Sequence, residues 1–215
     1  MKTKPRWIEL VLLAAPFVAL AVLWPSLPAR IPTHWGVSGQ VDGWSGRAFG
    51  ALLLPVMSVA AYLLLLFLPT FDPRMKKGVE GNSLAVLGIV RLAMVALLTF
   101  MFGVQMAVAL GVPIDSGRLI INGLLVFFLV MGNFFGSLRP NYFVGIRTPW
   151  TLESPATWRA THRVGGRIMV LGSLLLMALQ FVVPNISAAF LVFVLGLAVW
   201  SMVYSWSYHR THAAG

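Results

Sequence analysis

Six long apolar runs constrain this chain of 215 residues more than any other feature of its sequence. A helix needs roughly 20 mainly apolar residues to cross the hydrocarbon core of a bilayer. Apolar runs suited to that task cover residues 7–24, 48–68, 84–110, 119–135, 164–183 and 186–206. Because lipid offers the backbone no hydrogen bonds, such segments span as helices. The sequence therefore predicts an all-α membrane protein, built as a six-transmembrane-helix bundle.

The composition excludes several functional classes. Hydrophobic residues make up 59% of the chain and charged residues only 10%, which is typical of a membrane protein and not of a soluble one. Cysteine is absent, so disulfides, thiol nucleophiles and Cys-ligated metals are excluded. The net charge of +10 is spread between the apolar runs instead of gathering on one basic face, so we expect no direct contact with nucleic acid.

The distribution of lysine and arginine predicts the orientation of the bundle. Cytoplasmic loops of membrane proteins carry an excess of these residues. With the N-terminus in the cytoplasm, only Arg30, Arg47 and Arg118 of the 16 lie outside. The residues placed inside are Lys2, Lys4, Arg6, Arg74, Lys76, Lys77, Arg91, Arg139, Arg147, Arg159, Arg163, Arg167 and Arg210. We therefore predict a multi-pass membrane protein with both termini in the cytoplasm.

The predicted outer loop, residues 25–47, contains one pair of side chains that could bind a metal or take part in catalysis. Short extended segments around a turn at Gly36–Gly39 favour a small hairpin. His34 and Asp42 would meet across it, but zinc takes three or four ligands and only two are present, so we expect no metal site. In the alternative that we favour, His34 donates a hydrogen bond that organises a turn at Asp42. The candidate recognition residues of this loop are Pro32, His34, Trp35, Gly39 and Asp42.

The predicted inner loop, residues 137–163, is polar and rich in proline and glycine, which indicates a structured loop at the membrane surface. Ser154 followed by Pro155 is typical of a helix N-cap and first helical position, so a helix should begin there and enter the fifth span. His162 and Glu153 permit an acid–base interpretation. The same residues would arise if Arg139 and Arg147 met lipid phosphates and His162 tied the loop to the helix.

An enzyme is the less favoured interpretation. HExxH, GxSxG and Walker motifs are absent, and we expect no cofactor. The pair His34 and Asp42 faces the opposite compartment from Glu153 and His162, so these four residues do not form one site. Only a few polar residues lie within the spans, and Asn122 and Asn133, on one face of the fourth span, favour hydrogen bonding between helices.

Small residues at four-residue spacing predict close contacts between helices, because they let backbones approach in lipid. One such set lies on the third span and one on the fourth, and two adjacent glycines at the start of the fifth span allow the same close approach. They are Gly103, Ala107 and Gly111; Gly132 and Gly136; and Gly165 and Gly166.

Two motifs resemble the SdpI immunity-protein family of bacterial membrane proteins. Residues 31–44 (IPTHWGVSGQVDGW) resemble the family's N-terminal membrane module of unknown function, which gives a first domain at residues 1–70. Residues 139–153 (RPNYFVGIRTPWTLE) and 158–166 (WRATHRVGG) resemble the SdpI domain, which gives a four-helix domain at residues 71–215. The matching inner positions are Arg139, Asn141, Gly145, Arg147, Thr148, Pro149, Trp150, Thr151, Trp158, His162 and Gly166.

The resemblance implies a protein of the bacterial cytoplasmic (inner) membrane that protects its producer from a secreted, membrane-active toxic peptide. It also implies signalling, in which the engaged protein draws a cytoplasmic transcriptional repressor to the membrane. Membrane lipids are the remaining expected partners. An enzyme that acts on a peptide or lipid headgroup and a small peptide exporter are the alternative functions.

Overall fold

The computed structural model describes residues 5–76 and 82–212. Lys2, Lys4 and Lys77, which entered the prediction of orientation, lie outside the described residues. Six described helices are long and apolar enough to cross a membrane, so the prediction of a six-helix membrane bundle is confirmed. These helices are α1 (Trp7–Leu23), α2 (Arg47–Phe71), α4 (Asn82–Ala109), α5 (Ser116–Phe135), α7 (Pro155–Leu179) and α8 (Ile186–His212).

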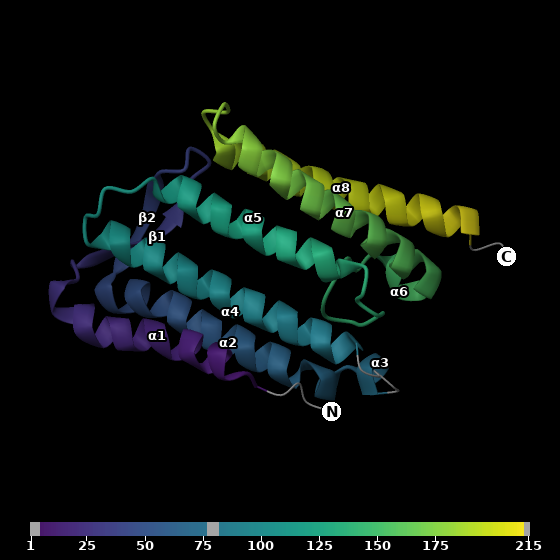
Figure 1. Cartoon of the computed structure of the whole chain (residues 1–215), viewed down its shortest axis with the longest axis horizontal. Helices are drawn as coiled ribbons and strands as arrows, with labels where there is room; N and C mark the ends of the chain where they lie inside the picture. The colour runs from purple at the N-terminus through teal and green to yellow at the C-terminus, as the bar shows by residue number, and fades with distance from the viewer. Residues whose placement is uncertain (1–4, 77–81, 213–215) are drawn as a thin grey trace.

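The six long helices run side by side along the long axis of the molecule (Figure 1). α4 packs against α1 and α2 on one side and against α5 on the other, and α5 packs against α7 and α8. Strands β1 (Arg30–Trp35) and β2 (Val41–Gly46) lie at one end, which we call the hairpin end. The short helices α3 (Pro73–Lys76) and α6 (Pro149–Glu153) lie at the other, which we call the loop end.

The predicted hairpin is confirmed and is anchored to three helices. β1 and β2 pair antiparallel, and Gly39 takes a φ of 80°, a conformation open to glycine without strain. The side-chain amide of Gln105 in α4 donates to the carbonyl oxygens of Pro32, at 2.8 Å, and Gly50, at 3.1 Å. The indole N–H of Trp35 donates to Ser116 Oγ in α5 at 2.9 Å. These contacts hold the hairpin against α2, α4 and α5.

A single turn of 3₁₀ helix, η1 (Trp24–Ser26), connects α1 to the hairpin.

The predicted contact of small residues between α5 and α7 is confirmed. A Cβ added to Gly166 would lie 2.5 Å from the Gly132 carbonyl oxygen, so the two backbones touch there. The prediction for α4 is wrong at Gly103, where an added Cβ would meet nothing within 4 Å. Spacing alone does not tell which face of a helix meets a neighbour. That face of α4 is open instead of packed.

Of the two asparagines predicted to form hydrogen bonds between helices, Asn122 does so and Asn133 does not. Asn122 exchanges hydrogen bonds with Gln180 at the end of α7, at 2.9 and 3.2 Å, which confirms a contact between helices. Asn133 is exposed on α5, and none of the hydrogen bonds found among the described residues involves its side chain. Its predicted interhelical bond is therefore absent from the described part of the bundle.

A buried ion pair joins α1 to α4. Arg91 donates to both carboxylate oxygens of Glu9, with nitrogen–oxygen distances of 2.8 to 3.2 Å, and neither side chain is exposed. Glu9 also accepts the backbone N–H of Arg6 at the start of α1. The guanidinium lies 5.2 Å from the ring centre of Tyr62 in α2.

Candidate functional site

The loop between α5 and α7 folds around the buried side chain of Asn141. Its amide group donates to the carbonyl oxygens of Arg139 and Val144, and its amide oxygen accepts the backbone N–H groups of Phe143 and Val144. All four bonds stay within a few residues, so one side chain replaces the regular hydrogen bonding that this segment lacks. The sequence motif thus encodes a defined loop conformation.

His162 fixes this loop to α7. Its Nδ1–H donates to the Trp158 carbonyl oxygen, and its Nε2 accepts the backbone N–H of Ile146, both at 2.9 Å. Since Nε2 acts as an acceptor, the ring is neutral. The indole of Trp158 stacks on it with ring centres 4.0 Å apart. Gly145, at a φ of 119°, lies against the same ring and leaves no room for a Cβ.

Trp158 also closes the start of the loop, because its buried indole N–H donates to the Leu138 carbonyl oxygen at 2.7 Å. The side chain therefore spans from α7 to a residue three positions beyond the end of α5. Together with His162 it holds both the beginning and the middle of the loop on the first turns of α7.

The TPWT part of the motif forms the short helix α6. Thr148 is its N-cap and accepts the backbone N–H of Thr151, and Pro149 occupies the first helical position. The Thr148 hydroxyl donates to Ser205 Oγ in α8 at 2.9 Å, while Trp150 is half-buried. The predicted cap at Ser154 is confirmed, since its hydroxyl accepts the Thr157 N–H at the start of α7. α6 thus ties the loop to α8.

A contact that the sequence reasoning missed holds the loop to α2. Asp72, buried directly after α2, accepts the backbone N–H of Tyr142 at 2.8 Å. The neighbouring Arg74 donates to the Leu152 carbonyl oxygen at 2.8 Å and lies over the Tyr142 ring. Asp72 follows an apolar run without any local motif, so no sequence signal pointed to it.

The remaining charged residues of the motif face outward. Arg139 is exposed, and Arg147 is exposed while it donates to the Tyr142 carbonyl oxygen. Glu153 is exposed and lies 3.6 Å from His209 in α8, whereas both ring nitrogens of His162 are occupied by the backbone. The geometry provides no contact between His162 and Glu153 of the kind that acid–base catalysis requires.

At the hairpin end, His34 Nδ1 lies 2.5 Å from Asp42 Oδ1, and both side chains are exposed. Pro32 and Gly39 are buried, and Gly39 packs against the backbone of Gly117 in α5. Of the five candidate recognition residues, His34 and Asp42 are therefore the two most accessible ones. Among residues 5–76 and 82–212, no group of three or more metal-ligating side chains is found.

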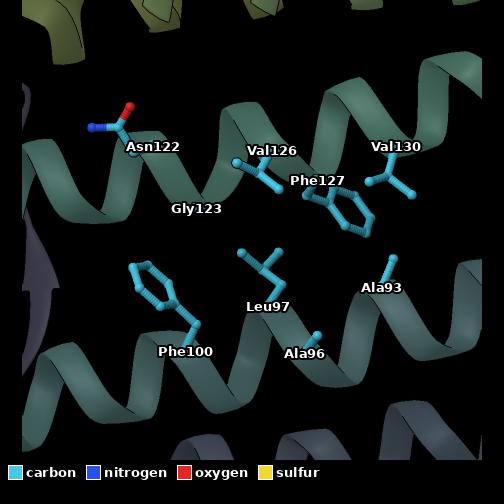
Figure 2. Close-up of a pocket in the computed structure, with 9 residues that line it drawn as sticks. All are labelled: Ala93, Ala96, Leu97, Phe100, Asn122, Gly123, Val126, Phe127 and Val130. Atoms are coloured by element: carbon cyan, nitrogen blue, oxygen red, sulfur yellow. The ribbon is translucent and has the colours of Figure 1, made fainter.

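A groove of about 370 Å³ runs between α4 and α5 (Figure 2). Small residues of α4, Ala93 and Ala96, face Val126 and Val130 of α5 across it. The groove's one strongly polar lining residue is Asn122, at the end nearest the hairpin. No sequence prediction identified this groove, since it depends on how two helices pack.

Comparisons with known proteins agree with this organisation. Residues 137–205 match the SdpI/YfhL protein family, and residues 11–59 match a domain of unknown function, DUF1648. The chain is 24% identical over 208 residues to the Immunity protein SdpI of Bacillus subtilis (strain 168), which covers 96% of this chain and 97% of the relative. No solved structure matches the chain. The first match contains the loop described above, and the second contains the hairpin.

Proposed function

Since this chain carries a domain of the SdpI/YfhL family and resembles an immunity protein over nearly its whole length, we propose that it is an immunity protein of receptor type. It protects a bacterial cell from a secreted, membrane-active toxic peptide. It lies in the inner membrane with the hairpin outside and both termini in the cytoplasm. This orientation is supported by the many arginines at the loop end, in keeping with the positive-inside rule.

One observation carries the receptor part of this proposal: a single helix connects the two motif regions. Strand β2 ends at Gly46, and α2 begins at Arg47 without a linker. α2 ends at Phe71, and Asp72 then accepts the Tyr142 N–H of the loop. Its 25 residues, which include Pro55 and Pro69, make a helix about 37 Å long at 1.5 Å per residue. A displacement of the hairpin therefore acts on the loop through one continuous helix.

The exposed His34 and Asp42 pair is the proposed point of contact with the peptide. The hairpin is tied to α2 and α4 through Gln105, so peptide binding changes the position of both helices. At the loop end the contact between Asp72 and Tyr142 then loosens, and the loop becomes accessible to a cytoplasmic partner such as a transcriptional repressor. The two sites and the element that couples them are the parts that signal transmission requires.

Challenge with secreted membrane-active peptides tests the assignment of the pair. Cells that express the chain are exposed to a panel of such peptides, and survival is compared at equal protein levels in the membrane. We expect His34→Ala and Asp42→Asn to lose protection and the exposed hairpin variant Gln40→Ala to retain it. Full protection by both pair variants would remove the hairpin from the proposal, and full protection by Arg147→Ala would remove that loop position.

The fate of the peptide separates immunity by binding from catalysis. The protein in detergent is incubated with the peptide against which it protects. The peptide is then recovered, and its mass is measured by mass spectrometry. We expect an unchanged mass and saturable binding, because His162 and Glu153 do not face each other. A changed mass would replace this proposal with the enzymatic one.

A further inference from the structure

Two exposed arginines of α7 lie next to the lipid-facing side of α5. Gly166 touches Gly132, and a Cβ added to Gly136 would lie 3.6 Å from the Cα of Arg163. Because α5 and α7 run antiparallel, Arg167 lies about level with Gly132, one turn inside the end of α5. Asn133, adjacent to Gly132, is exposed on the same side by helical periodicity. Arg163, Arg167 and Asn133 thus lie along one edge of the contact between the two helices, and we call this set of three residues the α5–α7 notch.

None of the described carboxylates neutralises the positive charge of the two arginines in the notch. The chain has six acidic residues, of which Glu80 lies outside the described residues. The other five have partners elsewhere: Glu9 with Arg91, Asp42 with His34, Asp72 with the loop, Asp115 with Arg118 and Glu153 with His209. Within the described part of the chain, no ion pair or hydrogen bond involves the notch side chains. Because arginines on membrane-spanning helices pair with anions or extend toward the headgroups, these two guanidinium groups suit an anionic ligand.

The apolar groove of Figure 2 reaches Val130, three residues before Asn133 on α5. Its lining on α5 runs from Asn122 to Val130, about 12 Å at 1.5 Å per residue, and Asn133 follows on the next turn. A helix of that length and of 10 Å diameter would fill roughly 900 Å³, well above the 370 Å³ of the groove. A flexible hydrocarbon chain fits the groove, whereas a helix does not.

We propose that the notch and the groove together bind one anionic phospholipid from the leaflet at the loop end. The phosphate accepts hydrogen bonds from Arg163 and Arg167, and the Asn133 amide donates a further bond. One acyl chain lies along the groove between α4 and α5, against Ala96 and Val126. Arginine suits this role because its guanidinium binds phosphate through two parallel N–H groups.

Native mass spectrometry of the purified full-length chain in detergent tests the headgroup site. The chain is titrated with phosphatidylglycerol and with phosphatidylcholine of identical acyl chains. We expect one bound phosphatidylglycerol with at least tenfold preference over phosphatidylcholine. In Arg163→Gln/Arg167→Gln we expect at least tenfold weaker binding, and in Arg163→Lys/Arg167→Lys a partial recovery. The control Arg118→Gln/Arg210→Gln removes the same charge elsewhere and should bind like the parent.

A second variant tests the acyl chain. Ala96→Phe fills the groove without a change in charge, and we expect it to weaken phosphatidylglycerol binding about tenfold. Glycerophosphoglycerol, the headgroup without acyl chains, should fail to compete at the same concentration. Equal binding of both lipids by the parent would overturn the proposal, as would equal weakening in the control variant. Unchanged binding in Ala96→Phe, or competition by the soluble headgroup, would overturn the placement of the chain in the groove.

Discussion

The buried pair of Glu9 and Arg91 makes the sharpest prediction about stability. Glu9→Gln removes the negative charge that faces a fully buried guanidinium and keeps the size of the side chain. Three bonds with nitrogen–oxygen distances of 2.8, 3.1 and 3.2 Å lose their charge assistance. Removing one partner of a buried ion pair costs about 3–5 kcal/mol, because the remaining charge loses the attraction that offset its burial. We expect a loss of that size in the free energy of unfolding.

Replacing both partners should restore most of this loss. Glu9→Leu/Arg91→Met leaves no buried charge, and well-packed apolar residues of similar volume often match a buried pair. We therefore expect the double variant to unfold within about 1 kcal/mol of the parent, since transfer of the charges into the bundle is no longer required.

Unfolding is measured in mixed micelles by titration with sodium dodecyl sulfate, with helix content followed by circular dichroism. Asp115→Asn is the matched control, because its pair with Arg118 is exposed and its side chain still caps α5. That change should cost no more than about 0.5 kcal/mol. A cost below about 1 kcal/mol for Glu9→Gln, or a double variant as unstable as the single one, would refute the reasoning.

Two further changes test helix packing and the loop. Gly166→Ala places a Cβ 2.5 Å from the Gly132 carbonyl oxygen and should lower stability by about 1–3 kcal/mol in the same titration, whereas Gly196→Ala, which meets nothing within 4 Å, should not. Asp72→Asn leaves one fewer acceptor for the Tyr142 N–H and the neighbouring backbone, so amide hydrogen exchange of residues 139–147 should become faster while the helices stay protected. Unchanged exchange in that loop would show that it does not depend on Asp72.

The features that sequence reasoning predicted well are local ones. Six spans follow from length and hydropathy, and the Ser154 cap and the Gly39 turn depend on a few adjacent residues. Each is decided by physics within one element, so no knowledge of the packing was needed. The loop motif was likewise identified as structured, and Asn141 shows why: most of its bonds close within the motif itself.

The features that sequence reasoning missed are contacts between distant parts of the chain. Glu9 meets Arg91 and Asp72 meets Tyr142 across long separations in sequence, and neither pair shares a motif. Spacing suggested a contact at Gly103 that the fold does not make, because small residues recur on lipid-facing sides as well. The division into domains at residues 1–70 and 71–215, and the roles of the recognition residues, stay predictions.

The bond from the Ile146 N–H to His162 links the shape of the loop to a proton. A second proton on the ring would convert the accepting Nε2 into a donor that faces another donor. The closed loop therefore favours the singly protonated ring, and by thermodynamic linkage a released loop favours the doubly protonated one. Any partner that pulls the loop open would free Nε2 to accept a proton, so loop opening should be accompanied by proton uptake.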